Sequence, residues 1–242
     1  MKLKNIPILI LAGGKGTRVQ HILKDTPKPL YPIHKFPFLD YLLGYLNSFG
    51  FQKFYLSIGY KSELFEKYYE NREDIFLIKE TYFLGTGGAV LNSLNHIAES
   101  DFLVLNGDTL YNLDYNKFIN FCKSKGEFPV IAIKETNDAK RFGSIQIDKE
   151  QKILAFKEKD SNNNLSSWIN AGIYFFKKKY LKDLKLPEVN SIEFDIFPLL
   201  AKTGLFAFKS KGEFIDIGTP ETLGQIEKFI HKNKVLPLKI KH

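Results

Sequence analysis

The residues best suited to chemistry form a glycine-rich loop with two cations, Gly13-Gly14-Lys15-Gly16-Thr17-Arg18, directly after the apolar run Ile6–Leu11. Three glycines in four positions let the backbone approach a ligand closely and turn N–H groups toward it, while the lysine and the arginine add positive charge. The loop does not match the Rossmann pattern G-x-G-x-x-G. It is not a Walker loop either, because it lacks the GK[ST] tripeptide. It predicts a phosphate-binding cradle, with a plain glycine turn as the alternative.

A third cation follows in Thr26-Pro27-Lys28-Pro29-Leu30, where prolines on both sides restrict the backbone. Taken alone, this lysine is more typical of a solvent-exposed proline turn. Because it comes shortly after the glycine loop, it becomes a candidate for a second phosphate contact.

Two aspartates stand at the ends of apolar runs. Asp108 follows Phe102–Leu105 after an Asn-Gly turn, and Asp216 follows Glu213–Ile215. Open α/β sheets bind ligands at the carboxyl ends of their strands. Two carboxylates from separate strands suit Mg²⁺, which keeps several waters and takes other ligands from phosphate. Asp108 alone is as compatible with a turn, but beside a phosphate cradle the pair predicts a magnesium site.

The elements that must position these residues alternate between β-rich runs and helical patterns, which is typical of a parallel sheet with crossover helices. Within the first half, the predicted strands are Ile6–Leu11, Lys53–Ile58, Ile75–Lys79, Phe102–Leu105 and Pro129–Lys134. The predicted helices there are Phe38–Phe49, Ser62–Glu70, Ala89–Ala98 and Asp114–Lys125.

The pattern changes from about Phe142, where the short runs Ser144–Ile147 and Ile153–Lys157 predict an antiparallel insertion. Further strands are predicted at Ala171–Phe176, Leu205–Phe208 and Glu213–Ile217, with a helix from Ser191 interrupted near Pro198 and a last helix over Pro220–Ile230. The whole predicts one α/β domain, a Rossmann-like three-layer fold whose central sheet is mixed but mostly parallel.

Six segments in order resemble the nucleoside-diphosphate-sugar pyrophosphorylases, which are sugar-1-phosphate nucleotidyltransferases. They are Leu11–Arg18, Pro27–Leu30, Gly85–Ala89, Asn106–Asp108, Phe156–Lys159 with Asn170–Gly172, and Asp216–Pro220. The resemblance covers Ile6 to about Ile230. Within the family, the Gly-Thr-Gly-Gly loop and the short chain are most similar to the guanylyltransferases that act on D-glycero-α-D-manno-heptose 1-phosphate.

The resemblance implies that an NTP and a sugar 1-phosphate react to give an NDP-sugar and pyrophosphate. The attacking phosphate oxygen is already ionised at pH 7, so neither a general base nor a protein nucleophile is needed. The composition agrees, because the sequence has no G-x-S-x-G elbow, and its five histidines show no metal-ligand spacing. To catalyse this reaction, the protein must hold two anions in line and neutralise their charge.

The resemblance also assigns roles. It implies a nucleotide-binding half (about 1–110), a sugar-binding half (111–220) that carries the antiparallel insertion, and a C-terminal helix with a basic tail (221–242). The implied nucleotide-binding residues are Leu11, Ala12, Gly13, Gly14, Lys15, Gly16, Thr17, Arg18, Gly85, Thr86 and Gly107. The implied catalytic residues are Arg18, Lys28 and Lys159, and Asp108 with Asp216 would hold Mg²⁺. The implied sugar-binding residues are Gly143, Glu158, Lys159, Asn170, Gly172 and Glu193, although Glu193 is nearly as typical of a solvated helix face.

The choice of base follows from the chemistry of Glu80, which stands where the thymidylyltransferase relatives carry a glutamine. A carboxylate only accepts hydrogen bonds, so its natural partner is a base edge with two adjacent donors. Guanine N1–H and N2–H₂ form such an edge, whereas thymine and uracil do not. We therefore expect a preference for GTP. Mannose, glucose or heptose 1-phosphate remain possible acceptors.

The net charge of +8 first suggests a polyanionic partner. Most of the excess lies in Lys2, Lys4 and the five lysines that follow Glu227, so it does not indicate nucleic acid. No apolar run approaches the ~18 residues of a membrane span, and the single cysteine fits a reducing compartment. We expect a cytoplasmic enzyme that binds neither membrane nor nucleic acid, with a homo-oligomer left open. The alternative of another class is a catalytically silent nucleotide-sugar sensor.

Overall fold

The computed structural model describes residues 2–136, 143–157 and 167–238. Its centre is a mixed sheet whose strands, in the described ranges, run in the order β10-β9-β11-β6-β1-β4-β5, with β8 pairing β11 and β12. The strand bounds are β1 Ile8–Leu11, β4 Phe54–Ile58, β5 Ile75–Lys79, β6 Asp101–Asn106, β8 Val130–Thr136, β9 Ser144–Ile147, β10 Ile153–Lys157, β11 Ser167–Lys177 and β12 Phe206–Ser210.

The parallel part of the sheet is formed by β5, β4, β1 and β6, which are neighbours in that order. The long strand β11 runs antiparallel to β6, β8 and β9, and β10 pairs antiparallel with β9 at the edge. The predicted Rossmann-like mixed sheet with a small antiparallel insertion is therefore confirmed. β12 adds a further parallel pairing, with β8.

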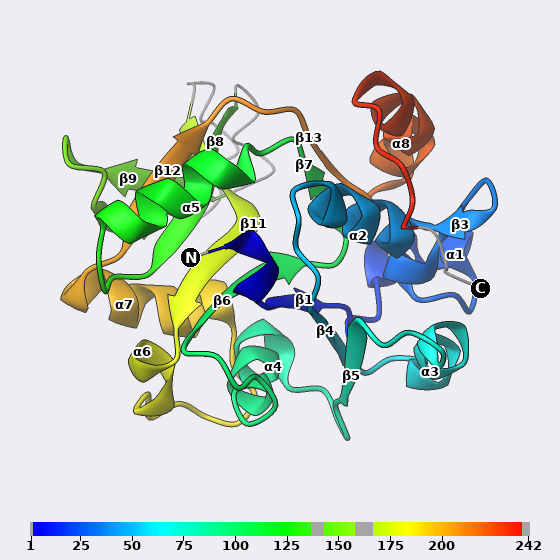
Figure 1. The fold of residues 1–242 in the computed structure, drawn as a ribbon, viewed down its shortest axis with the longest axis horizontal. Coiled ribbons are helices and arrows are strands. Elements are labelled where there is room, and N and C mark those ends of the chain that lie inside the picture. Colours follow the sequence, from blue (N-terminus) through cyan, green and yellow to red (C-terminus); the bar gives the residue numbers. More distant parts are fainter. Residues whose placement is uncertain (1, 137–142, 158–166, 239–242) are drawn as a thin grey trace.

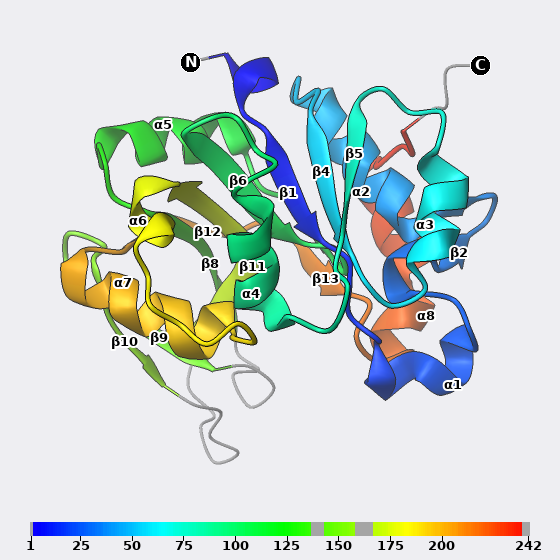
Figure 2. The same cartoon turned by 90° about the horizontal axis from the view of Figure 1, so that it is seen from below.

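Helices cover both faces of the sheet (Figures 1 and 2). α2 (Phe38–Ser48), α5 (Tyr115–Ser124) and α8 (Pro220–Lys232) lie on one face, and α4 (Gly85–Ser93), α6 (Lys179–Lys182) and α7 (Phe197–Thr203) lie on the other. The sequence of β1 explains this layering. Because side chains alternate along a strand, Ile8 and Ile10 enter the core beneath the first group of helices, while Leu9 enters the core beneath the second.

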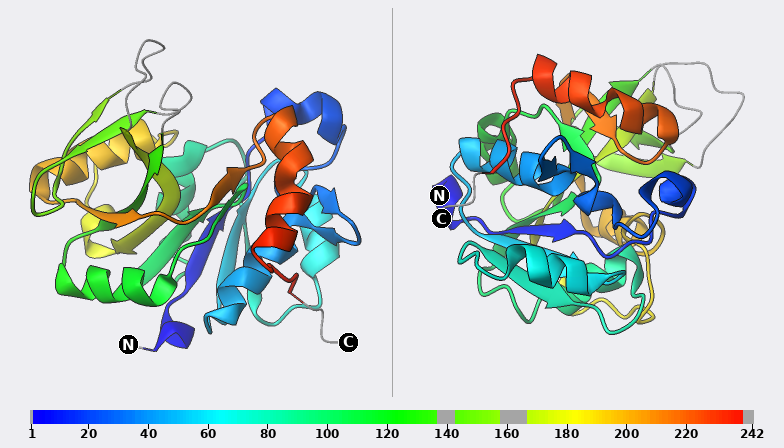
Figure 3. Two further views of the ribbon diagram at one scale, coloured as in Figure 1. Left: turned by 90° about the horizontal axis from the view of Figure 1, so that it is seen from above. Right: turned by 90° about the vertical axis from the view of Figure 1, so that its right-hand side faces the viewer.

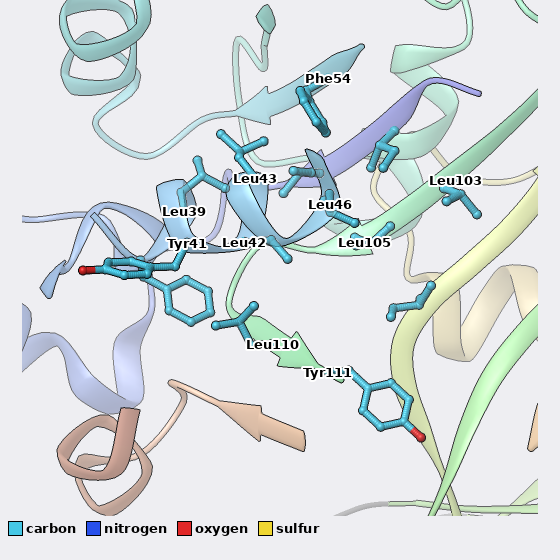
Figure 4. Close-up of a cluster of buried hydrophobic side chains, with 14 of the residues drawn as sticks. Leu39, Tyr41, Leu42, Leu43, Leu46, Phe54, Leu103, Leu105, Leu110 and Tyr111 are labelled. Carbon is cyan, nitrogen blue, oxygen red and sulfur yellow. The ribbon is translucent and has the colours of Figure 1, made fainter. Parts of the chain in front are cut away.

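Helix α2 fixes the strands that carry the site. Its buried leucines Leu39, Leu42, Leu43 and Leu46 belong to the same core as Phe54 of β4 and Leu103 and Leu105 of β6 (Figure 4). Burying each such side chain contributes roughly 1.5–3 kcal/mol relative to leaving it exposed. This apolar layer therefore packs α2 against β4 and β6.

The smaller elements complete the chain: α1 Gln20–Leu23, α3 Ser62–Tyr69 beside β5, the β2 (Pro32–Ile33) and β3 (Phe36–Pro37) pair, and the 3₁₀ turns Leu3–Asn5, Thr17–Val19 and Lys28–Leu30. Two short strands, β7 (Thr109–Tyr111) and β13 (Phe214–Asp216), form a separate antiparallel pair. Of these two, the sequence predicts only β13.

Two predicted helices differ from the structure, one in its bounds and the other in its helical geometry. The predicted helix Ala89–Ala98 is α4, which begins earlier at Gly85 and ends at Ser93, so the glycine-rich segment lies in its first turn. The helix predicted from Ser191 begins there as a π-helical turn over Ile192–Ile196, whose backbone N–H groups the Ser191 hydroxyl caps. It continues into α7, where Pro198 is accommodated in the first turn.

The segment after α8 returns to α2 (Figure 3). Val235 and Leu238 are buried there, and the Leu238 N–H donates to the Asp40 carbonyl oxygen at 2.8 Å. Within the described ranges, we find no helix with the length and apolar character needed to cross a bilayer.

Candidate active site

A cavity of about 220 Å³ lies at the carboxyl ends of the parallel strands, where the predicted nucleotide-binding residues meet. The glycine loop directly follows β1, Glu80 directly follows β5, and Asp108 comes two residues after β6. The topology therefore brings these segments to one edge, as expected for an open α/β sheet. The predicted residues that line the cavity are Leu11, Ala12, Gly13, Gly14, Gly16, Lys28, Glu80, Gly85, Thr86 and Asp108.

The glycine loop runs along one wall of this cavity. Gly16 adopts φ +61°, a left-handed conformation that a side chain rarely accepts, and the 3₁₀ turn Thr17–Val19 follows it. Gly107 N–H donates to the Leu11 carbonyl oxygen at 3.0 Å, and a Cβ on Gly107 would lie only 2.6 Å from that oxygen. Gly107 thus allows a close approach between the β6 turn and the end of β1; it is not part of the cavity lining, and its predicted contact with the nucleotide stays a prediction.

The remaining residues of the predicted cradle lie at its edge. Lys15, Thr17 and Arg18 are exposed and are not part of the cavity lining. A terminal nitrogen of Arg18 lies 3.3 Å from the position that a Cβ on Gly218 would occupy. The arginine therefore faces the turn that follows Asp216. This approach connects the glycine loop to the end of β13, the last described strand.

Lys28 and Asp108 form an ion pair in the cavity wall. The Lys28 Nζ to Asp108 Oδ2 distance is 2.8 Å, and their side chains are 11% and 31% exposed. The Thr109 hydroxyl donates to the other carboxylate oxygen, Oδ1, at 3.2 Å. The 3₁₀ turn Lys28–Leu30, with prolines before and after the lysine, buries the stem of this side chain. The ammonium is therefore presented on a stiff support.

The second predicted aspartate, Asp216, reaches the same region through the β7 and β13 pair. Asp216 is registered opposite Thr109, and the Ile217 N–H donates to the Asp108 carbonyl oxygen at 2.9 Å. Asp216 Oδ1 accepts the Gly218 N–H at 2.8 Å. In the part of the chain that is described, no three His, Cys, Asp or Glu side chains cluster as a metal site. The donor set is thus two hard carboxylates, Asp108 in the turn before β7 and Asp216 at the end of β13. These oxygen donors fit a Mg²⁺ ion that takes its other ligands from phosphate and water.

Glu80 is buried at the cavity wall, 9% exposed. The Ser57 hydroxyl donates to Glu80 Oε1 at 2.8 Å, and the backbone N–H of Leu84 donates to the same carboxylate. Burial raises the pKa of Glu80, and these two donors oppose the increase because they favour the charged form. A Cβ on Gly13 would lie 2.6 Å from Oε1, so the glycine provides the space that the carboxylate occupies.

The Gly-Thr-Gly-Gly segment packs against a distant loop. The N–H groups of Gly87 and Gly88 approach the Asn190 carbonyl oxygen at 2.9 and 3.4 Å, and a Cβ on Gly85 would lie 2.3 Å from that oxygen. The Thr86 hydroxyl accepts the Ile192 N–H at 3.0 Å and lies 3.3 Å from Glu193 Oε2. The glycines therefore permit the contact that brings Glu193 to the rim of the cavity.

The predicted sugar-side residues are only partly described. Asn170 Oδ1 accepts the Gly172 N–H at 2.9 Å, and Asn170 Nδ2 donates to the buried Tyr174 hydroxyl at 2.9 Å. Gly172, at φ +73°, lies against the cavity residue Asn106. Gly143 instead lies beside the backbone of Lys157 in the β9–β10 hairpin and is not part of the lining. Glu158 and Lys159 lie outside the described residues.

Sequence reasoning missed several residues of the site. Asn106 lines the cavity and hydrogen-bonds Tyr174, although it appeared only as part of a motif. Phe83 also lines the cavity with 63% of its surface exposed, and an aromatic residue in a loop after a strand gives no distinctive signal. Ser57, which holds Glu80, looks in the sequence like any polar residue in a strand.

The family to which the chain belongs follows from the match of its sequence. Residues 8–233 match the nucleotidyl transferase family. The chain belongs to this family, and the resemblance noted in the sequence is confirmed.

Particular relatives can now be named. The chain is 35% identical over 218 residues, 88% of its length and 95% of the other, to a protein named D-glycero-alpha-D-manno-heptose 1-phosphate guanylyltransferase from Campylobacter jejuni. A protein of the same name from Aneurinibacillus thermoaerophilus is 34% identical over 224 residues, 91% of this chain and 96% of the other. Among solved structures, HddC from Yersinia pseudotuberculosis has a TM-score of 0.82 at 37% identity, covering 93% of this chain and 99% of HddC. A structure of HddC complexed with GMP-PN has a TM-score of 0.80.

Proposed function

We propose that this enzyme transfers GMP from GTP to a sugar 1-phosphate, giving a GDP-sugar and pyrophosphate. The acceptor that we propose is D-glycero-α-D-manno-heptose 1-phosphate, the sugar phosphate in the names of both relatives. The observation that carries the proposal is the convergence of three features in one cavity: the glycine loop, the Lys28–Asp108 pair and the buried Glu80 carboxylate. The first two suit phosphate and metal, and the third suits a base with two donors.

In the proposed reaction, an oxygen of the sugar phosphate attacks the α-phosphorus of GTP, the bond from that phosphorus to the bridging oxygen breaks, and pyrophosphate leaves. Mg²⁺, held by Asp108 and Asp216, would supply charge neutralisation on the reacting phosphates. The glycine loop would bind the phosphates through its backbone N–H groups. Lys28 would turn its ammonium from Asp108 toward the phosphate charge, and Arg18 would lie on the opposite side, near the Asp216 turn. Catalysis would then consist of positioning and charge stabilisation.

Glu80 supports GTP as the nucleotide. Guanine would present N1–H and N2–H₂ to the carboxylate, whereas adenine would present the N1 acceptor and lose these bonds. Hydrogen bonds to a charged group contribute about 1.5–3 kcal/mol each, so the discrimination expected from one such bond is at least about tenfold.

On the sugar side, Asn170 and Glu193 support binding of hydroxyl groups. An amide can donate to and accept from a hydroxyl, and a carboxylate can accept from one. Both lie close to residues that line the cavity: Asn170 through Tyr174 and Asn106, and Glu193 through Thr86. These contacts support a hydroxyl-binding surface next to the proposed phosphate site.

Pyrophosphate release tests this function directly. The protein would be incubated with magnesium, one of GTP, ATP, dTTP or UTP, and the 1-phosphate of D-glycero-α-D-manno-heptose, mannose or glucose. We expect the highest kcat/KM for GTP with the heptose. Faster release with mannose would contradict the acceptor assignment alone, and faster release with another NTP would contradict the assignment of GTP. If no pair releases pyrophosphate while GDP-sugar still binds, the protein is a nucleotide-sugar sensor.

A further inference from the structure

The carboxylate proposed to contact guanine is held by a residue that does not itself line the cavity. Ser57 is the fourth residue of β4 and is fully buried, and its hydroxyl donates to Glu80 Oε1 at 2.8 Å. The same residue's carbonyl oxygen accepts the Ala12 N–H at 2.8 Å, so the serine is tied to the start of the glycine loop. Since Ser57 has no surface toward the ligand, any influence on nucleotide binding must pass through its neighbours.

Three contacts restrict the position of the Glu80 carboxylate. Ser57 donates from one side, the Leu84 N–H donates from the loop before α4, and Gly13 closes the space on the side of the glycine loop. A flexible glutamate loses conformational freedom when it is fixed, and this loss opposes binding when it occurs on binding. Contacts made before the nucleotide arrives remove that cost from binding.

The number of acceptor sites agrees with this arrangement. An ionised carboxylate has about four lone-pair sites for hydrogen bonds. Ser57 and Leu84 occupy part of this capacity, and the rest is available to a ligand. Guanine presents two adjacent donors on its Watson–Crick edge, whereas hypoxanthine presents only N1–H and adenine offers no such pair.

We propose that Ser57 is a positioning residue for base selection, which orients the Glu80 carboxylate so that its remaining acceptor sites face N1–H and N2–H₂ of guanine. This inference rests on the proposed GTP specificity and assigns its control to a buried hydroxyl. The pKa of Glu80 gives supporting evidence, because burial raises it and the Ser57 hydrogen bond lowers it. Without the hydroxyl, the pKa of Glu80 would rise further, and the carboxylate would lose an acceptor to protonation at a higher pH.

The test is equilibrium binding of GDP, IDP and ADP by calorimetry, because binding can be measured whether or not the protein turns over substrate. For Ser57→Ala we expect about a tenfold loss of GDP affinity, with ADP affinity unchanged, as lost orientation and increased protonation weaken bonds to a charged acceptor. The preference for GDP over IDP should shrink in parallel. The pH below which GDP binding weakens should rise.

The matched control is Ser93→Ala. Ser93 is also fully buried, and its hydroxyl donates to the Ala89 carbonyl oxygen at 2.7 Å within α4, but it does not contact Glu80. We expect this variant to keep the preference for GDP over ADP. A double-mutant cycle with Glu80→Gln adds a second readout, because Ser57→Ala should have little further effect on selectivity once the carboxylate is absent.

The outcomes separate the two claims. If folded Ser57→Ala keeps the selectivity of the unmodified protein while Glu80→Gln loses it, the Ser57 inference is wrong and the base contact stands. If the unmodified protein does not prefer GDP, or if Glu80→Gln keeps the preference, the assignment of the base contact fails and the role of Ser57 fails with it. Equal effects of Ser57→Ala in the presence and absence of Glu80 would show a structural role only.

Discussion

Adding one methyl group to the glycine loop, with Gly13→Ala, should impair recognition of the base while sparing the phosphate site. The new Cβ would lie 2.6 Å from Glu80 Oε1 and 3.2 Å from the backbone nitrogen of Gly59. The first distance is shorter than side chains tolerate, and a carboxylate gives way more readily than a strand-end backbone. We therefore expect Glu80 to move and its 2.8 Å hydrogen bond from Ser57 to lengthen or break.

The size of the effect follows from the bonds that depend on this position. A displacement of roughly 0.5 Å is enough to take O–H···O and N–H···O contacts out of their favourable range. Loss of one bond between guanine and the charged carboxylate would cost about 1.5–3 kcal/mol, which corresponds to about a 10- to 100-fold weaker affinity for GDP. Adenine does not present two adjacent donors to this carboxylate, so the affinity of the protein for ADP should change little.

Calorimetric titration of GDP and ADP would measure this selectivity, with Gly14→Ala as the steric control. A Cβ on Gly14 meets no atom within 4 Å, so this variant adds the same methyl group to the same loop without touching Glu80. It should leave the ratio of GDP to ADP affinities unchanged, even if both nucleotides bind more weakly. Adding Glu80→Asp to Gly13→Ala should restore part of the preference, because the shorter side chain leaves room for the methyl group. An unchanged ratio in Gly13→Ala itself would refute this reasoning.

Three further perturbations are expected to have distinct effects. Asp216→Asn should lower the rate of pyrophosphate release at least about 100-fold at limiting magnesium, since the metal loses an anionic ligand, and the same magnesium dependence as the unmodified protein would contradict this role. Gly44→Ala should lower the free energy of unfolding in urea by about 2–4 kcal/mol, because its Cβ would lie 2.1 Å from the Leu236 carbonyl oxygen and would lift the C-terminal segment from α2; an unchanged urea midpoint would show that this packing is not required. GDP affinity should fall as the pH drops through the raised pKa of Glu80, since the protonated form loses an acceptor, and Glu80→Gln should lack this step in a pH series of titrations.

The parts of the site that the sequence predicted are those with a local physical signal. The glycine loop and Asp108 each follow a short apolar run that ends at a turn, and the parallel topology brings the ends of such runs together. The last helix also has a local signal in the sequence. It begins with Pro220 after Thr219, whose hydroxyl caps it by accepting the Thr222 N–H.

The parts that the sequence did not predict depend on contacts between residues far apart in the chain. The sequence predicts the Gly-Thr-Gly-Gly segment as a loop that precedes a helix, but its glycines lie in the first turn of α4, where they allow the Asn190 backbone to approach. Strand β7 is only three residues long and pairs with β13 about a hundred residues later, so periodicity could not reveal it. The hydrogen bond from Ser57 to Glu80 likewise joins residues near the ends of two different strands.

The charges of the cavity explain why the net charge of the chain was a poor guide to its ligand. The charged residues of the lining are one cation, Lys28, and two carboxylates, Glu80 and Asp108. Lys28 is already paired with Asp108 at 2.8 Å, so this wall carries no excess of positive charge that would attract a triphosphate. The proposed affinity for GTP would therefore come from backbone N–H groups of the glycine loop and from the arginine at its edge, and a metal ion held by the aspartates would supply further positive charge. An ionised Glu80 at such a site is tolerable only because its own hydrogen bonds satisfy it, which makes base selection and site electrostatics parts of one arrangement.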